Sequence, residues 1–116
     1  FATILGACGV PSPTDRVIDG ADALGALTGR AASVDRPKPL YWRLDMAPPR
    51  EKVQVALRDG DWKILASRHL DRVELYNLRD DPRETTDRSA AEPDRLRAMK
   101  AALEAIHREV EAEGPD

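Results

Sequence analysis

The chain has 116 residues, of which 41% are hydrophobic and 34% are charged. That length supports one small domain, which buries roughly two thirds of the surface that its unfolded chain exposes. No apolar run approaches the roughly 20 residues of a membrane-spanning helix. The net charge is -3, with 18 basic and 21 acidic residues mixed along the chain, so no basic stripe is available for DNA or RNA. We therefore expect a globular domain without membrane or nucleic-acid partners.

The first third of the chain predicts a helix end, a short helix and two loops. Its opening letters, FATILGACGV, are apolar and have no capping residue before them, which is typical of a helix that begins further upstream. We place this helix over residues 1–7 and its stop at Gly9. A second helix is expected over residues 21–27. Residues 11–20 and 30–39 should form ordered loops, because they are rich in turn-forming residues.

Four strands are predicted in the middle of the chain, where apolar and polar residues alternate. They cover residues 40–44, 52–58, 62–67 and 72–78. Asp59 and Gly60 predict a two-residue type I′ hairpin, because both residue types tolerate positive φ angles. In the third strand Trp62 should share a face with Ile64, so Lys63 must point to the opposite face.

The C-terminal helix has the most regular pattern. It should begin at about Glu92 or Pro93 and end at Glu113, with an apolar stripe that faces the sheet. The stripe consists of Leu96, Met99, Leu103, Ile106 and Val110. The predicted fold is therefore α+β, a four-stranded antiparallel sheet packed by one long helix. We expect this subdomain over residues 40–116 and an irregular lead-in over residues 1–39.

Residues that could carry chemistry are few. Cys8 excludes an internal disulfide and has no base beside it to activate a thiol, so we interpret it as a buried structural residue. His69 and His107 lack the spacing of metal ligands, and we expect His69 on the surface and His107 partly covered on the helix. Gly-rich phosphate loops and a G-x-S-x-G elbow are both missing from the sequence. No complete catalytic constellation is present.

Two carboxylate pairs could have a chemical role, because such pairs bind calcium or divide the roles of acid and base. They are Asp59 with Asp61 and Asp80 with Asp81. Both pairs fall in predicted turns, where aspartate accepts hydrogen bonds from nearby backbone donors. A calcium loop needs several more oxygen ligands at fixed spacing, so the turn interpretation is favoured. We assign no catalytic, cofactor-binding or metal-binding residue to this chain.

Several short segments follow one another in an informative order. They are ATILGACGVPSPTDRVIDG, KPLYWRL, ALRDGDWKIL, ELYNLRDDPRETTD and, after the helix, EGPD. Together they resemble the C-terminal region of formylglycine-dependent sulfatases in the alkaline phosphatase superfamily, especially bacterial proteins similar to arylsulfatase A and N-acetylgalactosamine-6-sulfatase. The resemblance runs from Phe1 to Asp116. It departs at Arg83, where glycine is expected in the DP-x-E stretch.

The resemblance implies that a large α/β domain with the active site precedes this small one. It implies a parent enzyme that hydrolyses sulfate esters of carbohydrates or aryl groups, with calcium and a formylglycine made from a Cys/Ser-x-Pro-x-Arg motif. This chain lacks that motif, because the string from Cys8 has one residue too many before its proline and carries Pro13 in place of arginine. The resemblance thus implies a fragment that is inactive alone and binds neither cofactor. A periplasmic or secreted location is implied as well.

The partners implied are the missing N-terminal catalytic domain and a sulfated small molecule or glycan, and the surface left exposed predicts self-association. We expect the small domain to line the substrate cleft with residues 30–39 and 46–51. Arg43, Arg50 and Lys63 are the candidates for contact with an anionic sugar, although an exposed arginine is the commoner case. Two alternatives stay open: a stand-alone interaction module without chemistry, and the C-terminal part of a related phosphoesterase.

Overall fold

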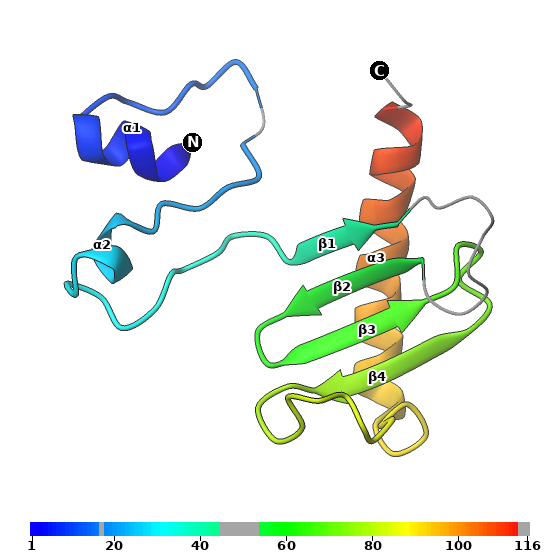
Figure 1. Cartoon of the computed structure of the whole chain (residues 1–116). Coiled ribbons are helices and arrows are strands. Elements are labelled where there is room, and N and C mark those ends of the chain that lie inside the picture. Colours follow the sequence, from blue (N-terminus) through cyan, green and yellow to red (C-terminus); the bar gives the residue numbers. More distant parts are fainter. Residues whose placement is uncertain (17, 45–53, 114–116) are drawn as a thin grey trace. The chain divides into compact units, whose positions relative to one another are not determined.

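The computed structural model describes residues 1–16, 18–44 and 54–113 (Figure 1). The chain forms two compact units, Phe1–Lys38 and Pro39–Asp116. The second unit holds a four-stranded antiparallel sheet and one long helix, as the alternation and the helical stripe predict.

The first unit contains two short helices, α1 (Ala2–Cys8) and α2 (Leu24–Leu27). Gly9 ends α1 in the left-handed conformation, with φ 65°, as its position in the sequence predicts. The prediction that α2 begins at residue 21 is wrong, because the Asp22 carboxylate accepts a hydrogen bond from the Leu24 N–H at 2.8 Å and holds the preceding residues in a turn. Cys8 is exposed, which corrects its interpretation as a buried thiol.

The exposure of Cys8 has a physical reason. None of the residues of α1 is buried, since this helix is not enclosed by a core within its unit. The link between α1 and α2 is instead polar, as the Thr3 hydroxyl accepts a hydrogen bond from the Ala23 N–H at 3.0 Å. Residue tendencies alone predict a buried cysteine, but burial requires neighbours that this short helix lacks.

The strands of the second unit pair in chain order. They are β1 (Leu40–Arg43), β2 (Val55–Asp59), β3 (Trp62–Ala66) and β4 (Val73–Asn77). Each neighbouring pair is antiparallel, so the sheet is a simple meander in the order β1-β2-β3-β4. The helix α3 (Pro93–Glu113) lies against one face of this sheet, behind it in Figure 1. Its observed bounds confirm the prediction.

The hairpin between β2 and β3 differs in detail from the sequence prediction. Asp59 still pairs with Trp62, so the two loop residues are Gly60 and Asp61 rather than Asp59 and Gly60. Among the described residues here only Gly60 has a positive φ, 56°, whereas a type I′ turn needs two such residues. The observed pattern is that of a type II′ turn, with glycine first. The two-residue loop therefore starts one residue later than predicted. Each strand residue still lies on the sheet face that alternation predicts.

The core lies between the sheet and α3. Four of its side chains, Leu57, Ile64, Leu75 and Leu103, have no exposed surface. Of the predicted stripe on α3, Met99 and Leu103 are buried and the others are half-buried. One apolar helix face on one apolar sheet face therefore supplies this hydrophobic core.

A compact loop follows β4 and covers its outer edge. Asp81 accepts hydrogen bonds from the N–H groups of Thr85 and Thr86, both at 2.8 Å. Asp87 accepts from the Leu75 N–H at 3.0 Å, and the Arg88 N–H donates to the Leu75 carbonyl at 2.7 Å. The turn interpretation of Asp80 and Asp81 is thus confirmed. The loop satisfies backbone groups that an edge strand otherwise exposes.

Candidate functional site

The sheet has two faces of different character. Toward α3 it presents Trp62 and Ile64, with Trp62 beneath the guanidinium of Arg95, whose Cζ lies 5.0 Å from the ring centroid. The face away from α3, here called the open face, carries Trp42, Lys63 and the other alternate residues of the strands. Trp62 and Lys63 therefore lie on opposite sides of the sheet, as the alternation predicts.

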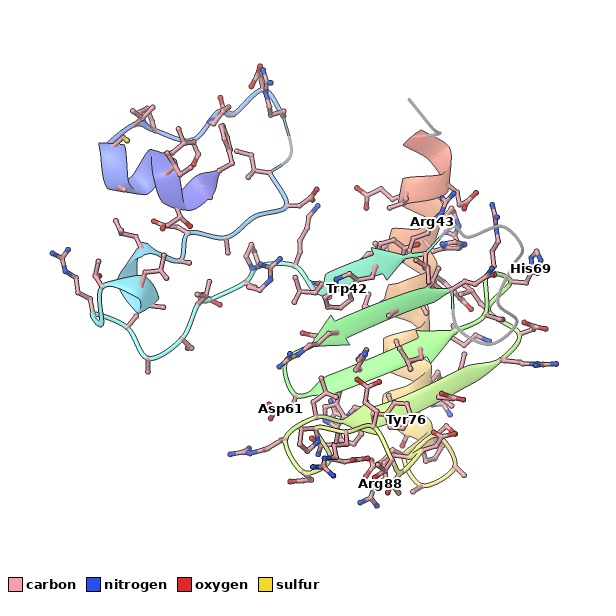
Figure 2. The ribbon with its side chains drawn as sticks, viewed as in Figure 1. Trp42, Arg43, Asp61, His69, Tyr76 and Arg88 are labelled. Atoms are coloured by element: carbon pink, nitrogen blue, oxygen red, sulfur yellow. The ribbon has the colours of Figure 1, made fainter. Side chains whose placement is uncertain are left out.

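Arg43 belongs to the α3 side. Its Nη1 donates to Glu111 Oε1 at 2.8 Å, and two residues earlier the hydroxyl of Tyr41 lies 2.8 Å from Nδ1 of His107. These two contacts connect β1 to the C-terminal half of α3. Figure 2 labels Arg43. His107 is half-buried there, as predicted for a partly covered helix residue, and His69 is exposed, as predicted for a surface residue. The cleft contact predicted for Arg43 stays a prediction.

Lys63 belongs to a polar cluster on the open face. Its Nζ lies 2.6 Å from Glu84 Oε1, and the two side chains are only 23% and 27% exposed. Beside it on β4, the Tyr76 hydroxyl donates to Glu74 Oε2 at 3.0 Å. Burial, together with the nearby Glu74 carboxylate, raises the pKa of Tyr76 to about 12. Lys63, Glu74, Tyr76 and Glu84 thus pair their charges and donors among themselves.

A shallow hollow of about 450 Å³ adjoins this cluster on the open face. Its lining consists of Trp42, Arg43, Leu44, Gln54, Val55, Ala56, Lys63 and Leu65. Arg43 and Lys63, two of the three sequence candidates, both border the hollow, but the Arg43 side chain bonds to Glu111 on the α3 side of the sheet. Two apolar members of this lining, Trp42 and Leu44, are 47% and 53% exposed. Neither was a sequence candidate, although alternation along β1 puts them on the sheet face opposite Tyr41 and Arg43.

The third candidate, Arg50, and the loop over residues 46–51 lie outside the described residues. Residues 30–38 of the other predicted loop belong to the first unit, where Arg36 donates to the Asp19 carbonyl at 3.3 Å. A hollow of about 380 Å³ in that unit is lined in part by Arg16, Asp22 and Asp35. Arg16 is already paired with its neighbour Asp15 at 2.7 Å.

Neither a metal centre nor a membrane-spanning helix is found in the part of the chain that the structure describes. No group of three or more histidine, cysteine, aspartate or glutamate side chains there is arranged to hold a metal ion. None of the helices in those same ranges combines the length and the apolar character needed to cross a bilayer. The described part of the second unit thus consists of a packed sheet and helix, an apolar hollow on the open face, and a polar cluster whose members bond to one another.

The chain matches no protein-family model and no curated protein sequence. It does match solved structures. One is BT4656 in complex with its substrate D-glucosamine-2-N,6-O-disulfate, with a TM-score of 0.68 and 23% identity over 98% of this chain and 24% of that chain. Another, BT33336S-sulf, comes from work on the metabolism of multiple glycosaminoglycans by Bacteroides thetaiotaomicron, with a TM-score of 0.64 and 18% identity over 92% and 24%.

Both matched structures are bacterial sulfatases. The chain spans about a quarter of their length. At identities below 25% the likeness establishes the fold, and that fold is an α+β domain, a four-stranded antiparallel sheet with a long helix, found within bacterial sulfatases. What the matched proteins bind or hydrolyse bears on this chain only as a proposal.

Proposed function

We propose that this chain is the C-terminal part of a bacterial sulfatase, a sulfuric ester hydrolase that acts on sulfated carbohydrates or aryl sulfates. The observation that carries the proposal is the fold match to BT4656 over 98% of the chain. The ordered segments from ATILGACGVPSPTDRVIDG to EGPD support it independently, because they are features of the amino-acid sequence rather than of the fold. Two matched sulfatases, both connected with sulfated or glycosaminoglycan sugars, favour a carbohydrate substrate.

Within such an enzyme the share of this chain is structural. A formylglycine would supply the nucleophile and calcium would stabilise the developing charge, and we place both on the catalytic domain, outside these residues. The sheet and α3 form a rigid support, since their core side chains are fully enclosed. We also infer a periplasmic or secreted location for the parent enzyme from the sulfatase resemblance.

Lys63 is the candidate for substrate contact that the geometry supports best. It lies on the open face at the rim of the hollow, whereas Arg43 is tied to Glu111 on α3. An anionic sugar that approached Lys63 would compete with Glu84, which lies 2.6 Å from its ammonium. Glu84→Gln would therefore lower the KM for a sulfated sugar if Lys63 contacts substrate, and Lys63→Met would raise it.

The proposal is tested on the protein produced from the complete reading frame that encodes this chain. We expect that frame to contain a Cys/Ser-x-Pro-x-Arg motif, and the purified protein to release sulfate from glucosamine 6-sulfate or 4-nitrocatechol sulfate. The control replaces the Cys or Ser of the motif with alanine and should abolish release. The 116-residue chain alone should show no turnover.

Two results would contradict the proposal. Sulfate release by the 116-residue chain would show that it holds a nucleophile of its own. A frame without the motif, whose product hydrolyses phosphate esters through a Thr or Ser nucleophile, would assign the chain to a related phosphoesterase instead.

A further inference from the structure

The loop between β3 and β4, residues 67–72, concentrates positive charge at one end of the sheet. Its letters are SRHLDR, so it carries Arg68, His69 and Arg72 but only one carboxylate, that of Asp71. These four side chains are exposed. Guanidinium groups bind sulfate, phosphate and carboxylate through paired N–H donors. The β3–β4 loop therefore has the chemistry of an anion-binding site.

Backbone hydrogen bonds and a buried anchor hold the β3–β4 loop in one shape. The Ser67 N–H donates to the Arg72 carbonyl at 3.1 Å, and the Leu70 N–H donates to the Ser67 carbonyl at 3.0 Å. Leu70 lies in the left-handed region, with φ 58°, and packs against the core. This conformation is unfavourable for a bulky side chain, and such strain is frequent at functional sites. The loop thus presents its charged side chains from a fixed backbone.

The charge of Arg72 is not neutralised by an ion pair in the part of the chain that the structure describes. The carboxylate of the loop, Asp71, accepts a hydrogen bond from the Ser67 hydroxyl instead. On α3, by comparison, the exposed Arg97 does have a carboxylate partner, because its Nη1 lies 3.0 Å from Asp94 Oδ1. The Arg72 guanidinium therefore keeps its N–H donors available for a ligand.

The β3–β4 loop lies at the end of the sheet near which the substrate cleft is expected. Arg43, Val55, Ala66 and Val73 are in register across the four strands, so β1 and β3 end there and β2 and β4 begin there. Figure 2 labels His69 at this end of the sheet. The segment predicted to line the cleft, residues 46–51, follows β1 in the chain and lies outside the described residues.

We infer that the β3–β4 loop binds a sulfate group of an oligosaccharide chain, on a sugar other than the one that is hydrolysed. This inference rests on the proposed function and adds an accessory binding site to it. Arg68 and Arg72 supply guanidinium donors for the sulfate oxygens, and His69 supplies a ring N–H. A nucleic acid fits less well, because the whole chain has a net charge of -3 and one short loop cannot follow a phosphate backbone.

The first test measures the affinity of the 116-residue chain for a heparin hexasaccharide by isothermal titration calorimetry. The double variant His69→Ala/Arg72→Ala should weaken binding by at least about fivefold, as expected for the loss of two exposed polar contacts. Arg97→Ala is the control, because it removes a similar charge from a distant part of the same unit. Circular dichroism checks that each variant is folded. Equal affinities of the double variant and the parent chain would overturn the inference.

Other ligands separate sulfate recognition from general attraction. A hexasaccharide from which the sulfate groups have been removed should bind at least about fivefold more weakly than the sulfated one. Equal binding of the two would show that sulfate is not recognised and would overturn the inference. A single-stranded hexanucleotide that bound as tightly as the sulfated hexasaccharide would also overturn it, because the loop would then be assigned to phosphate polyanions.

Kinetics of the product of the complete reading frame connect the loop to catalysis. For a heparin hexasaccharide that ends in glucosamine 6-sulfate, the double variant should raise the KM by at least about threefold more than it does for glucosamine 6-sulfate itself. If the longer protein is an active sulfatase and the two KM values change equally, the accessory site fails while the proposed function stands. If it releases no sulfate but binds the hexasaccharide through this loop, the site stands while the proposed function fails.

Discussion

Trp62 shows how a single residue joins the sheet to the helix. It is half-buried, packs against the core and lies under Arg95 of α3. Its neighbour Lys63 points the other way, so the two adjacent residues serve different surfaces. Because side chains alternate along a strand, the amino-acid sequence alone predicts that these two neighbours lie on opposite faces. The partner of Lys63, by contrast, comes from a loop 21 residues away and could not be read from the sequence.

Truncation of Trp62 should destabilise the chain strongly. We expect Trp62→Ala to lower the free energy of unfolding by about 3 kcal/mol, the low end of the range for tryptophan because the side chain is only half-buried. Urea denaturation followed by circular dichroism measures this change. The matched control is Trp42→Ala on the open face, which should cost less in the 116-residue chain. An unfolding midpoint unchanged by Trp62→Ala would refute its packing beneath α3.

Asp81 and Asp87 make stability depend on pH. The hydrogen bond from the Thr86 N–H is the main cause that lowers the pKa of Asp81. At Asp87 burial acts to raise the pKa, but the hydrogen bonds from Leu75 and Ser89 together outweigh it, so that this pKa is lowered as well. A lowered pKa means that the folded state favours the carboxylate. The stabilisation is therefore complete above the unfolded value of about 3.9 and is lost as the pH falls through the folded value.

This dependence predicts a smaller free energy of unfolding at pH 3 than at pH 7. Asp81→Asn should reduce the difference in the free energy of unfolding between pH 3 and pH 7, because the substitution removes one of the two carboxylates that cause this difference. Asp94→Asn is the control, since the Asp94 carboxylate bonds to the exposed Arg97 side chain on the same helix. Urea titrations at both pH values measure the effect. Identical pH profiles for Asp81→Asn and the parent chain would exclude the assigned role.

At the scale of elements, the hairpin between β2 and β3 depends on Gly60. Its φ of 56° lies in the left-handed region, and a Cβ added there would meet no atom within 4 Å. The cost of a side chain is therefore conformational rather than steric. Gly60→Ala should lower the free energy of unfolding by about 1 kcal/mol, and Gly60→Asn by less, because asparagine tolerates this region. Equal thermal shifts for the two variants would contradict this account.

The elements themselves follow from local patterns to different degrees. The bounds of α3 could be predicted because its apolar stripe repeats with the helical period along the whole helix. The strands are predicted to within a few residues, but the turn at Gly60 is displaced by one, because either neighbouring aspartate can flank glycine in a tight turn. The short helix α2 loses three predicted residues because Asp22 competes for the backbone.

At the scale of the whole molecule, the sheet, its order and its helix could be predicted, because each strand is adjacent to the next in the chain. The candidate site could not be predicted equally well. Arg43 was a candidate because of its positive charge. The sequence did not reveal its partner Glu111, which lies 68 residues away on α3. Trp42 was not a sequence candidate, because an aromatic residue in a strand is usually assigned to the core. The sequence does not say which face of the first strand the helix covers.

The most direct test of the sulfatase assignment is sulfate release from glucosamine 6-sulfate by the product of the complete reading frame, with glucosamine 6-phosphate as the parallel substrate. We expect inorganic sulfate to accumulate with catalytic turnover and phosphate release to be far slower. Turnover of the phosphate ester without release of sulfate would contradict it.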